Sequence, residues 1–195
     1  FAKSIAPYES GQLGEGLPGP GSGNSVFPRA FLAWCLALQG SFRDARSVCQ
    51  DLKRIIGLPA IGDSPYLVLG THWAEGTVAL EQGDFERAQR VFELALPLCR
   101  DWQIGLWQTV MTTGAGRAAT FCGRPDEAVV LLEEAQQIAR QNRVTEAIAG
   151  VWLADACARV GRAEQARSEA ERALVHAREH GERCWEAYAV HCLAE

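Results

Sequence analysis

The stretch GDFERAQRVFELA, residues 83–95, contains the pattern that decides the fold. It begins with a glycine, has an alanine five positions later, and ends with a second alanine after seven more positions. A further small residue, Gly76, lies seven positions before the glycine. The same pattern, with a small or apolar residue at its last position, occurs three more times: at Ala33, Gly40, Ala45 and Leu52; at Gly116, Gly123, Ala128 and Ala135; and at Ala154, Gly161, Ala166 and Ala173. The intervals between the anchoring glycines are 43, 40 and 38 residues, which indicates a repeat array.

Each position of the pattern has a physical role in a pair of packed helices. The glycine ends one helix, because glycine adopts left-handed backbone angles without the penalty of a Cβ atom. The small residue before it and the alanine after it lie where two antiparallel helices approach closely, so bulky side chains are excluded there. Ser41 with Asp44, and Asp84 with Glu86, place acceptors and negative charge at the start of the second helix of their hairpins.

These features predict an all-α protein, a right-handed superhelical solenoid of about four antiparallel helix hairpins followed by a final helix. The first helices are expected at 28–39, 65–82, 106–122 and 146–160, and the second helices at 42–56, 85–102, 125–142 and 163–180. The final helix begins near Arg183. In the last second helix, one apolar stripe has the helical period: Ala163, Ala166, Ala170, Ala173, Leu174 and Ala177.

The first 25 residues differ in composition from the rest. Residues 11–25 are rich in Gly, Pro and Ser, which is typical of linkers. We therefore expect a flexible segment over 1–25 and a helical repeat domain over 26–195. The chain starts without a methionine and stops inside the predicted final helix, so we expect it to be a piece of a larger protein.

The charge of the chain and the spacing of its cysteines limit the partners and the cellular compartment that we expect. The net charge is −5, and the Lys and Arg residues are scattered, which argues against a nucleic-acid partner. No apolar run approaches the roughly 18 residues of a membrane span. None of the seven cysteines falls in a C-x-x-C pair, so we expect core-filling thiols in a reducing cytoplasm.

The small residue, Gly, Ala and Ala anchors resemble the tetratricopeptide repeat, and the period near 40 resembles its longer variety. More narrowly, the stretches 32–37, 83–88 and 180–183 are similar to certain bacterial signalling proteins. In those proteins a repeat array follows an ATPase domain, often with an adenylate-cyclase-type or transcriptional-regulator domain elsewhere. The resemblance covers about residues 14–195. The ATP-binding and catalytic motifs of those proteins have no matching positions here, so no such activity carries over.

The resemblance implies a binding surface, because the first helix of each repeat hairpin lines a concave groove. Mapping the motif onto this chain points six residues into that groove: Trp34, Trp73, Thr77, Thr113, Arg117 and Asp155. Trp and Arg are favoured hot-spot residues at interfaces. Two structural alternatives remain open, in which the Trp residues pack between hairpins and Arg117 forms an ion pair with Asp155.

Two other patterns suggest chemistry that their context disfavours. Residues 114–119 match part of a dinucleotide fingerprint, but they lie inside a predicted helix, where close helix packing explains the glycines better. His176, His180 and Cys184 have a spacing of four that could suit zinc, but Gly181 interrupts the helix between them. We therefore expect no enzyme activity, cofactor or metal.

Two functions remain. The favoured one is a scaffold or regulatory module that binds a protein or peptide in the groove. The alternative is a sensor that holds a small ligand and relays its occupancy to an attached ATPase, cyclase or DNA-binding domain. Self-association is a further possibility, because the final helix lacks a hairpin mate and its apolar face needs cover. That face comprises Trp185, Tyr188, Ala189 and Cys192.

Overall fold

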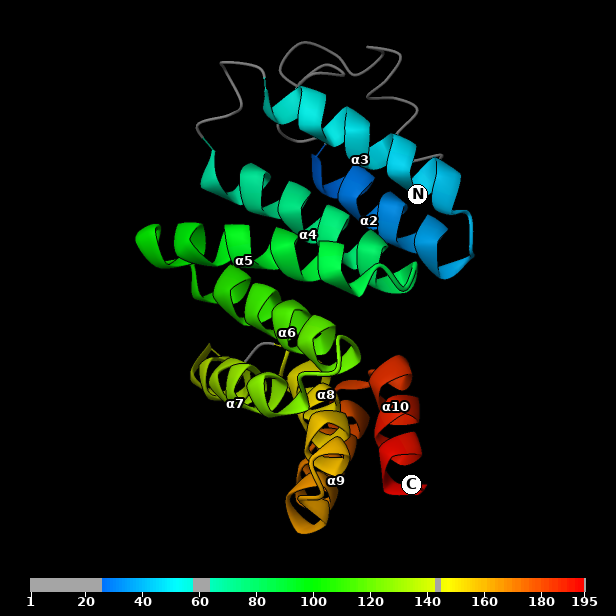
Figure 1. Ribbon diagram of the computed structural model, residues 1–195, viewed down its shortest axis with the longest axis vertical. Helices are drawn as coiled ribbons and strands as arrows, with labels where there is room; N and C mark the ends of the chain where they lie inside the picture. Colours follow the sequence, from blue (N-terminus) through cyan, green and yellow to red (C-terminus); the bar gives the residue numbers. More distant parts are fainter. Residues whose placement is uncertain (1–25, 58–63, 143–144, 195) are drawn as a thin grey trace. The chain divides into compact units, whose positions relative to one another are not determined.

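The computed structural model of the protein describes residues 26–57, 64–142 and 145–194. These residues form nine α-helices and no strand (Figure 1). In chain order the helices are α2 (Val26–Leu38), α3 (Phe42–Ile56), α4 (Pro65–Glu81), α5 (Phe85–Asp101), α6 (Gly105–Phe121), α7 (Pro125–Asn142), α8 (Glu146–Arg159), α9 (Ala163–His180) and α10 (Arg183–Ala194). The all-α prediction is confirmed, and the helix ends lie within two residues of those expected. The expected linker over 1–25 lies outside the described residues.

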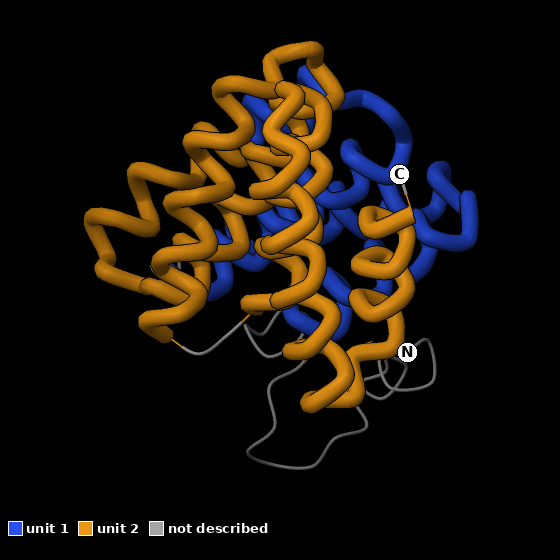
Figure 2. The backbone as a smooth tube through the Cα atoms, turned by 90° about the horizontal axis from the view of Figure 1, so that it is seen from below, with its two compact units in different colours: residues 1–91 blue, residues 92–195 orange. Residues whose placement is uncertain are grey.

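Helices that follow one another in the chain pack as hairpins, α2 with α3, α6 with α7 and α8 with α9. Helix α4 packs against both α2 and α3, and α10 packs against α8 and α9. The chain divides into two compact units, unit 1 (residues 1–91) and unit 2 (residues 92–195), as Figure 2 shows. The boundary falls inside α5, so this helix contributes residues to both units.

The anchoring glycines have the left-handed backbone that ends a helix. Their φ values are +77° at Gly40, +79° at Gly83, +75° at Gly123 and +77° at Gly161. In the first turn the Gly40 amide donates to the Ala37 carbonyl at 2.9 Å, and the Ser41 amide donates to the Leu36 carbonyl at 2.9 Å. This is the Schellman pattern of a helix end, and the other three turns repeat it. The predicted role of the glycines is confirmed.

The small residues of the pattern are buried between helices. This holds for Ala33, Gly76, Gly116 and Ala154 before the glycines, and for Ala45, Ala88, Ala128 and Ala166 after them. A Cβ atom on Gly116 of α6 would lie 2.5 Å from Cγ of Leu132 on α7. A Cβ atom on Gly114 would lie 2.5 Å from Cζ of Phe92. These distances confirm that the glycines within 114–119 serve close helix packing.

Helix capping agrees with the sequence at one hairpin and differs at another. The carboxylate of Asp84 accepts a hydrogen bond from the backbone amide of Arg87 at 3.3 Å, as an N-cap side chain does. Ser41 makes no capping hydrogen bond with its side chain, so the acceptor expected there is wrong. The backbone angles of Ser41, φ −79° and ψ 56°, lie outside the extended region typical of a capping residue.

The cysteines are free, and their surroundings differ. Cys49, Cys99 and Cys157 are buried, which confirms the core-filling role predicted for them. Burial raises the pKa of the Cys49 thiol to about 12, and the pKa of Cys99 and of Cys157 to about 11. The same role is wrong for Cys184, which is exposed near the start of α10.

The final helix, α10, packs against other helices of unit 2. Ala189 is fully buried, the ring of Tyr188 lies 5.4 Å from the ring of Trp152 on α8, and the Cys192 thiol donates to the Val151 carbonyl at 3.7 Å. The apolar face predicted for this helix therefore packs on α8, and self-association through it stays a prediction.

None of the helices that the structure describes combines the length and the apolar character needed to cross a bilayer.

Candidate functional site

In unit 1, two predicted site residues form an aromatic cluster on the first helices. The rings of Trp34 on α2 and Trp73 on α4 lie 5.7 Å apart at an angle of 67°, an edge-to-face arrangement. The ring of Phe31, which is 40% exposed, lies 5.1 Å from that of Trp73. Both Trp residues are half-buried, whereas the third predicted residue of this unit, Thr77, is buried. The Trp residues thus pack between hairpins and keep part of their surface exposed.

In unit 2, Arg117 and Asp155 belong to one chain of contacts between α6 and α8. The guanidinium carbon of Arg117 lies 4.3 Å from the ring centroid of Trp152, within the range of a cation–π contact. The Asp155 carboxylate accepts a hydrogen bond from Arg159 Nε at 3.0 Å, one turn along α8. The guanidinium carbon of Arg159 in turn lies 5.1 Å from the ring centroid of Phe121.

The remaining predicted residue, Thr113, has an internal role. It is buried, and its hydroxyl donates to the Thr109 carbonyl at 2.8 Å within α6. The hydrogen bond of the Thr113 hydroxyl is therefore made within its own helix.

Sequence reasoning missed the aromatic part of the unit 2 surface. The ring of Trp152 lies 6.4 Å from that of Phe121 and 5.4 Å from that of Tyr188, which is 39% exposed. The available signal was spacing, because Phe121 follows Arg117 by four residues and Arg159 follows Trp152 by seven, so each pair shares a helix face. We call Arg117, Phe121, Trp152, Arg159 and Tyr188 the cation–aromatic surface.

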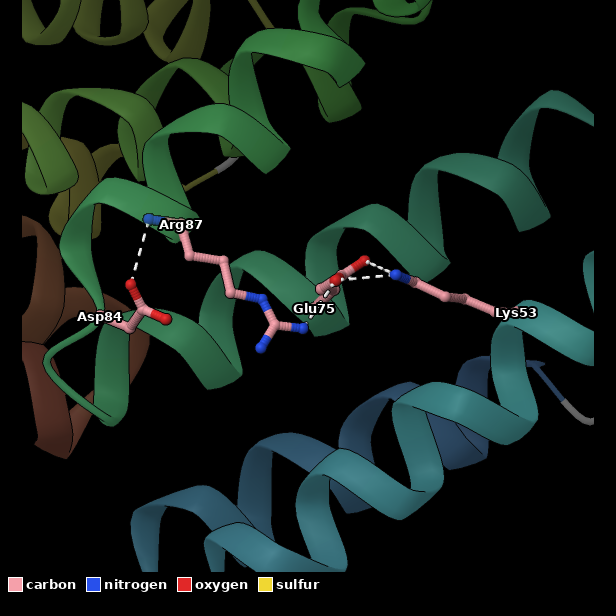
Figure 3. A network of polar contacts seen from close by, with 4 residues as sticks. All are labelled: Lys53, Glu75, Asp84 and Arg87. Carbon is pink, nitrogen blue, oxygen red and sulfur yellow. Dashed lines mark hydrogen bonds and ion pairs between the residues drawn. The ribbon is translucent and has the colours of Figure 1, made fainter.

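Unit 1 also contains a buried carboxylate between two cations (Figure 3). Glu75 of α4 is 8% exposed. The Nζ atom of Lys53 on α3 lies 2.7 Å from Oε2 and 2.8 Å from Oε1 of Glu75, and Nη2 of Arg87 on α5 lies 2.9 Å from Oε1. These side chains border a cleft of about 110 Å³, lined also by Arg46, Cys49, Gln50, Val78, Ala79 and Gln82. We call it the Glu75 cleft.

The two cations control the charge of this carboxylate. Burial acts to raise the pKa of Glu75, but the hydrogen bonds and charges of Lys53 and Arg87 outweigh it and hold the pKa below its ordinary value. For His72, three residues earlier on α4, burial disfavours the charged form and lowers the pKa, although the negative charge of Glu75 acts to raise it. At neutral pH, Glu75 is therefore charged and His72 is neutral.

The repeat register shows that Glu75 is unusual. It lies eight positions before Gly83, and the equivalent positions before the other anchoring glycines hold Leu32, Ala115 and Leu153. Ala115 and Leu153 are buried. A charged residue at a position that is otherwise apolar was the signal by which the sequence could have revealed this site.

Unit 2 has a wider depression of about 490 Å³ at the equivalent place, between α7 and α9. It is lined by Glu133, Gln136, Gln137, Arg140, Gln141, Leu153, Gln165 and Glu169. The buried carboxylate of Glu169 lies 3.5 Å from Nη2 of Arg140 and also pairs with Arg172. The carboxylate in this depression therefore belongs to a second helix, α9, whereas Glu75 belongs to a first helix.

The histidine pattern forms a stack on α9. The rings of His176 and His180 lie 4.1 Å apart, and α9 ends at His180. Gly181, with φ +69°, therefore separates this helix from Cys184. Among the described residues, no group of three or more His, Cys, Asp and Glu side chains is placed to hold a metal ion.

Comparison with known proteins agrees with the observed repeats. The sequence model of the tetratricopeptide repeat matches residues 26–51, 69–93, 112–134 and 147–172, about half of the chain. No curated protein sequence matches the chain.

A solved structure with a similar fold is that of a signal transduction ATPase with numerous domains (STAND) protein with a tetratricopeptide repeat sensor, from Pyrococcus horikoshii. The TM-score is 0.64 at 14% sequence identity, over 86% of this chain. The chain spans 26% of that protein, and the likeness concerns the fold. The resemblance seen in the sequence is confirmed, and the chain belongs to the tetratricopeptide repeat family.

Proposed function

We propose that the chain is a non-catalytic module that binds a protein or peptide and acts as a regulatory part of a larger cytoplasmic signalling protein. Its family supports this, because tetratricopeptide repeats are a protein-interaction scaffold. The observation that carries the proposal is the cation–aromatic surface, in which Arg117 stacks 4.3 Å above Trp152. Seven free cysteines fit a reducing compartment.

The side chains of this surface suit recognition. Arginine and aromatic residues contribute most of the binding energy at typical interfaces. The stack on Trp152 holds the guanidinium of Arg117 in one orientation, so little side-chain freedom is lost when a partner binds. Phe121 and Tyr188 expose part of their rings, which can pack against an apolar side chain. The partner we propose is a segment with an apolar side chain beside a hydrogen-bond acceptor.

Unit 1 offers a second surface, which is aromatic, on its own first helices. Trp34, Trp73 and the exposed edge of Phe31 provide apolar contact area there. We propose that Thr77 and Thr113, which are buried, support these surfaces from within. Asp155 would act by positioning Arg159 beside Phe121.

The alternative function is a sensor that binds a small ligand and relays its occupancy to an attached ATPase, cyclase or DNA-binding domain. It is favoured by the likeness to the STAND protein, which is described as having a tetratricopeptide repeat sensor. The depression of unit 2, at about 490 Å³, has the size of a small-ligand pocket.

Peptides selected from a random displayed library against the full chain test the proposal. We expect Arg117→Ala to weaken the selected peptides about tenfold or more, as loss of a hot-spot arginine does. Arg124→Ala is the matched control, because Arg124 pairs with the exposed Glu127 at the start of α7, and its removal should leave affinity unchanged.

The result is interpretable only if Arg117→Ala stays folded, so its melting temperature is measured alongside and should fall by only a few degrees. Peptide affinities that are unaffected by Arg117→Ala would contradict the surface proposed here. A small-molecule hit that raises the melting temperature, and does so no longer after Gln136→Leu, would favour the sensor.

A further inference from the structure

The Glu75 cleft is positively charged in a chain that is negatively charged overall. Three cations, Arg46, Lys53 and Arg87, line it together with the single carboxylate of Glu75, which leaves a surplus of two positive charges. The chain as a whole carries a net charge of −5. Like charges brought together repel one another, so the surplus positive charge attracts an anion to the cleft.

The carboxylate of Glu75 does not occupy all the donors around it. Lys53 contacts both of its oxygens, whereas Arg87 contacts it through Nη2. A guanidinium has five N–H donors, so Arg87 keeps donors on Nη1 and Nε for another acceptor. Arg46 is exposed and forms no hydrogen bond or ion pair with any residue that the structure describes.

The repeat fold does not require these charges. At the equivalent repeat positions of unit 2 lie Val129, Gln136, Leu153 and Gln165 in place of Arg46, Lys53, Glu75 and Arg87. The hairpins of unit 2 pack against one another with these uncharged residues. The charged set is therefore a property of this cleft, and it needs an explanation other than helix packing.

We propose that the Glu75 cleft binds a phosphoryl group. A phosphate monoester carries about −1.5 to −2 charges at pH 7, which matches the surplus of the cleft. Its terminal oxygens can accept hydrogen bonds from Arg46 on α3 and from Arg87 on α5, and guanidinium groups suit phosphate oxygens geometrically. Glu75 acts as a positioning residue, because it holds Lys53 and Arg87 at the cleft. A volume of about 110 Å³ suits a single small group of this kind.

A carboxylate is a poorer match, since it has one negative charge and two coplanar oxygens. This site lies within unit 1 and is independent of the cation–aromatic surface of unit 2. The phosphoryl group could belong to a free phosphate compound or to a phosphorylated protein segment, and the experiment separates these sources.

Isothermal titration calorimetry of the full chain, at constant ionic strength, tests the proposal with three probes. These are inorganic phosphate, a short peptide with one phosphoserine, and acetate. We expect one or both phosphoryl probes to bind, with acetate at least about tenfold weaker. Arg46→Gln should weaken binding about tenfold or more, as loss of a charge-assisted hydrogen bond does. Arg43→Gln is the matched control, because it removes the same charge from an exposed position three residues earlier on α3.

Arg46-dependent binding of inorganic phosphate supports the site and assigns it to free phosphate compounds. Arg46-dependent binding of the phosphopeptide alone supports the site and assigns it to a modified protein. The proposal is overturned if neither phosphoryl probe binds at millimolar concentration, if acetate binds equally well, or if Arg43→Gln causes the same loss as Arg46→Gln. Circular dichroism checks that each variant is folded. If Arg46→Gln does not fold, Arg46→Lys takes its place, because it keeps the positive charge but lacks the planar guanidinium. Arg46→Lys should bind the phosphoryl probe several-fold more weakly than the unaltered protein.

Discussion

The surfaces between successive second helices differ between the two units, although the hairpins around them are built alike. In unit 1 the centre is Glu75 of α4, with Lys53 and Arg87 within ion-pair distance on either side. In unit 2 the equivalent centre is Leu153, and a buried carboxylate, Glu169, comes from α9 instead.

The glutamine side chains of unit 2 show the same contrast between the units. Gln136 stands at the position of Lys53, is 5% exposed, and has no hydrogen-bond partner for its Oε1 atom among the described residues. The small residues and glycines determine the backbone in both units, whereas the residue at the centre is free to be charged or apolar. Chemical differences between the units therefore reside in these centres and their neighbours.

The largest effect is expected when unit 2 is given the centre of unit 1. Leu153→Glu places a carboxylate at a position that is 1% exposed, between the uncharged Gln136 and Gln165. A buried carboxylate that lacks the two cations of the unit 1 centre should lower the free energy of unfolding by about 3–5 kcal/mol, measured by urea denaturation. Adding Gln136→Lys and Gln165→Arg should restore about half of the loss. A triple variant no more stable than Leu153→Glu would show that the two centres are not equivalent.

A smaller effect is expected when the charge of the unit 1 centre is removed. Glu75→Gln keeps the shape of the side chain and should lower the free energy of unfolding by about 1–2 kcal/mol at pH 7. The pKa of Glu75 is lower in the folded protein than in the unfolded chain, where it is about 4.3. The charge of Glu75 therefore stabilises the fold fully above this unfolded-state pKa, and the stabilisation is lost as the pH falls through the pKa of the folded state. The difference between the protein and Glu75→Gln should therefore shrink toward zero in acid. Urea unfolding across a pH series measures it, and a difference that stays constant down to about pH 3 would exclude charge as its cause.

The smallest effect concerns the turns, where the units should respond alike. Gly83→Ala and Gly123→Ala each place a Cβ atom where nothing lies within 4 Å, so strain at positive φ is the only cost. Each should lower the free energy of unfolding by about 1 kcal/mol. Thermal unfolding of both variants measures this, and unequal losses would show that the two turns have different surroundings.

The hairpins could be predicted because their signals are local. Gly40 and its equivalents end helices through their own backbone angles, and α3, α7 and α9 have the bounds expected from the sequence. Ser41 shows the limit of local reasoning. Its residue type favours a cap, but the turn sets backbone angles that the residue type alone does not reveal.

The candidate sites depend on contacts between distant parts of the chain. Glu75 is separated from Lys53 by 22 residues and from Arg87 by 12, so their ion pairs exist only once α3, α4 and α5 are packed. Arg117 was predicted from its place in the repeat, but its partner Trp152 comes from another hairpin. Comparison of the repeats position by position would have exposed Glu75, whereas spacing along the helix faces would have exposed the residues around Arg117.

The uneven burial of the thiols has a practical consequence. The seven cysteines all lie within the described residues, and Cys184 alone among them is exposed. Thiolates are the reactive form, and the buried Cys49, Cys99 and Cys157 keep their protons far above neutral pH. A maleimide dye should therefore attach preferentially to Cys184 on α10, next to Trp185. The emission of the dye can then report changes around the neighbouring tyrosine and tryptophan rings.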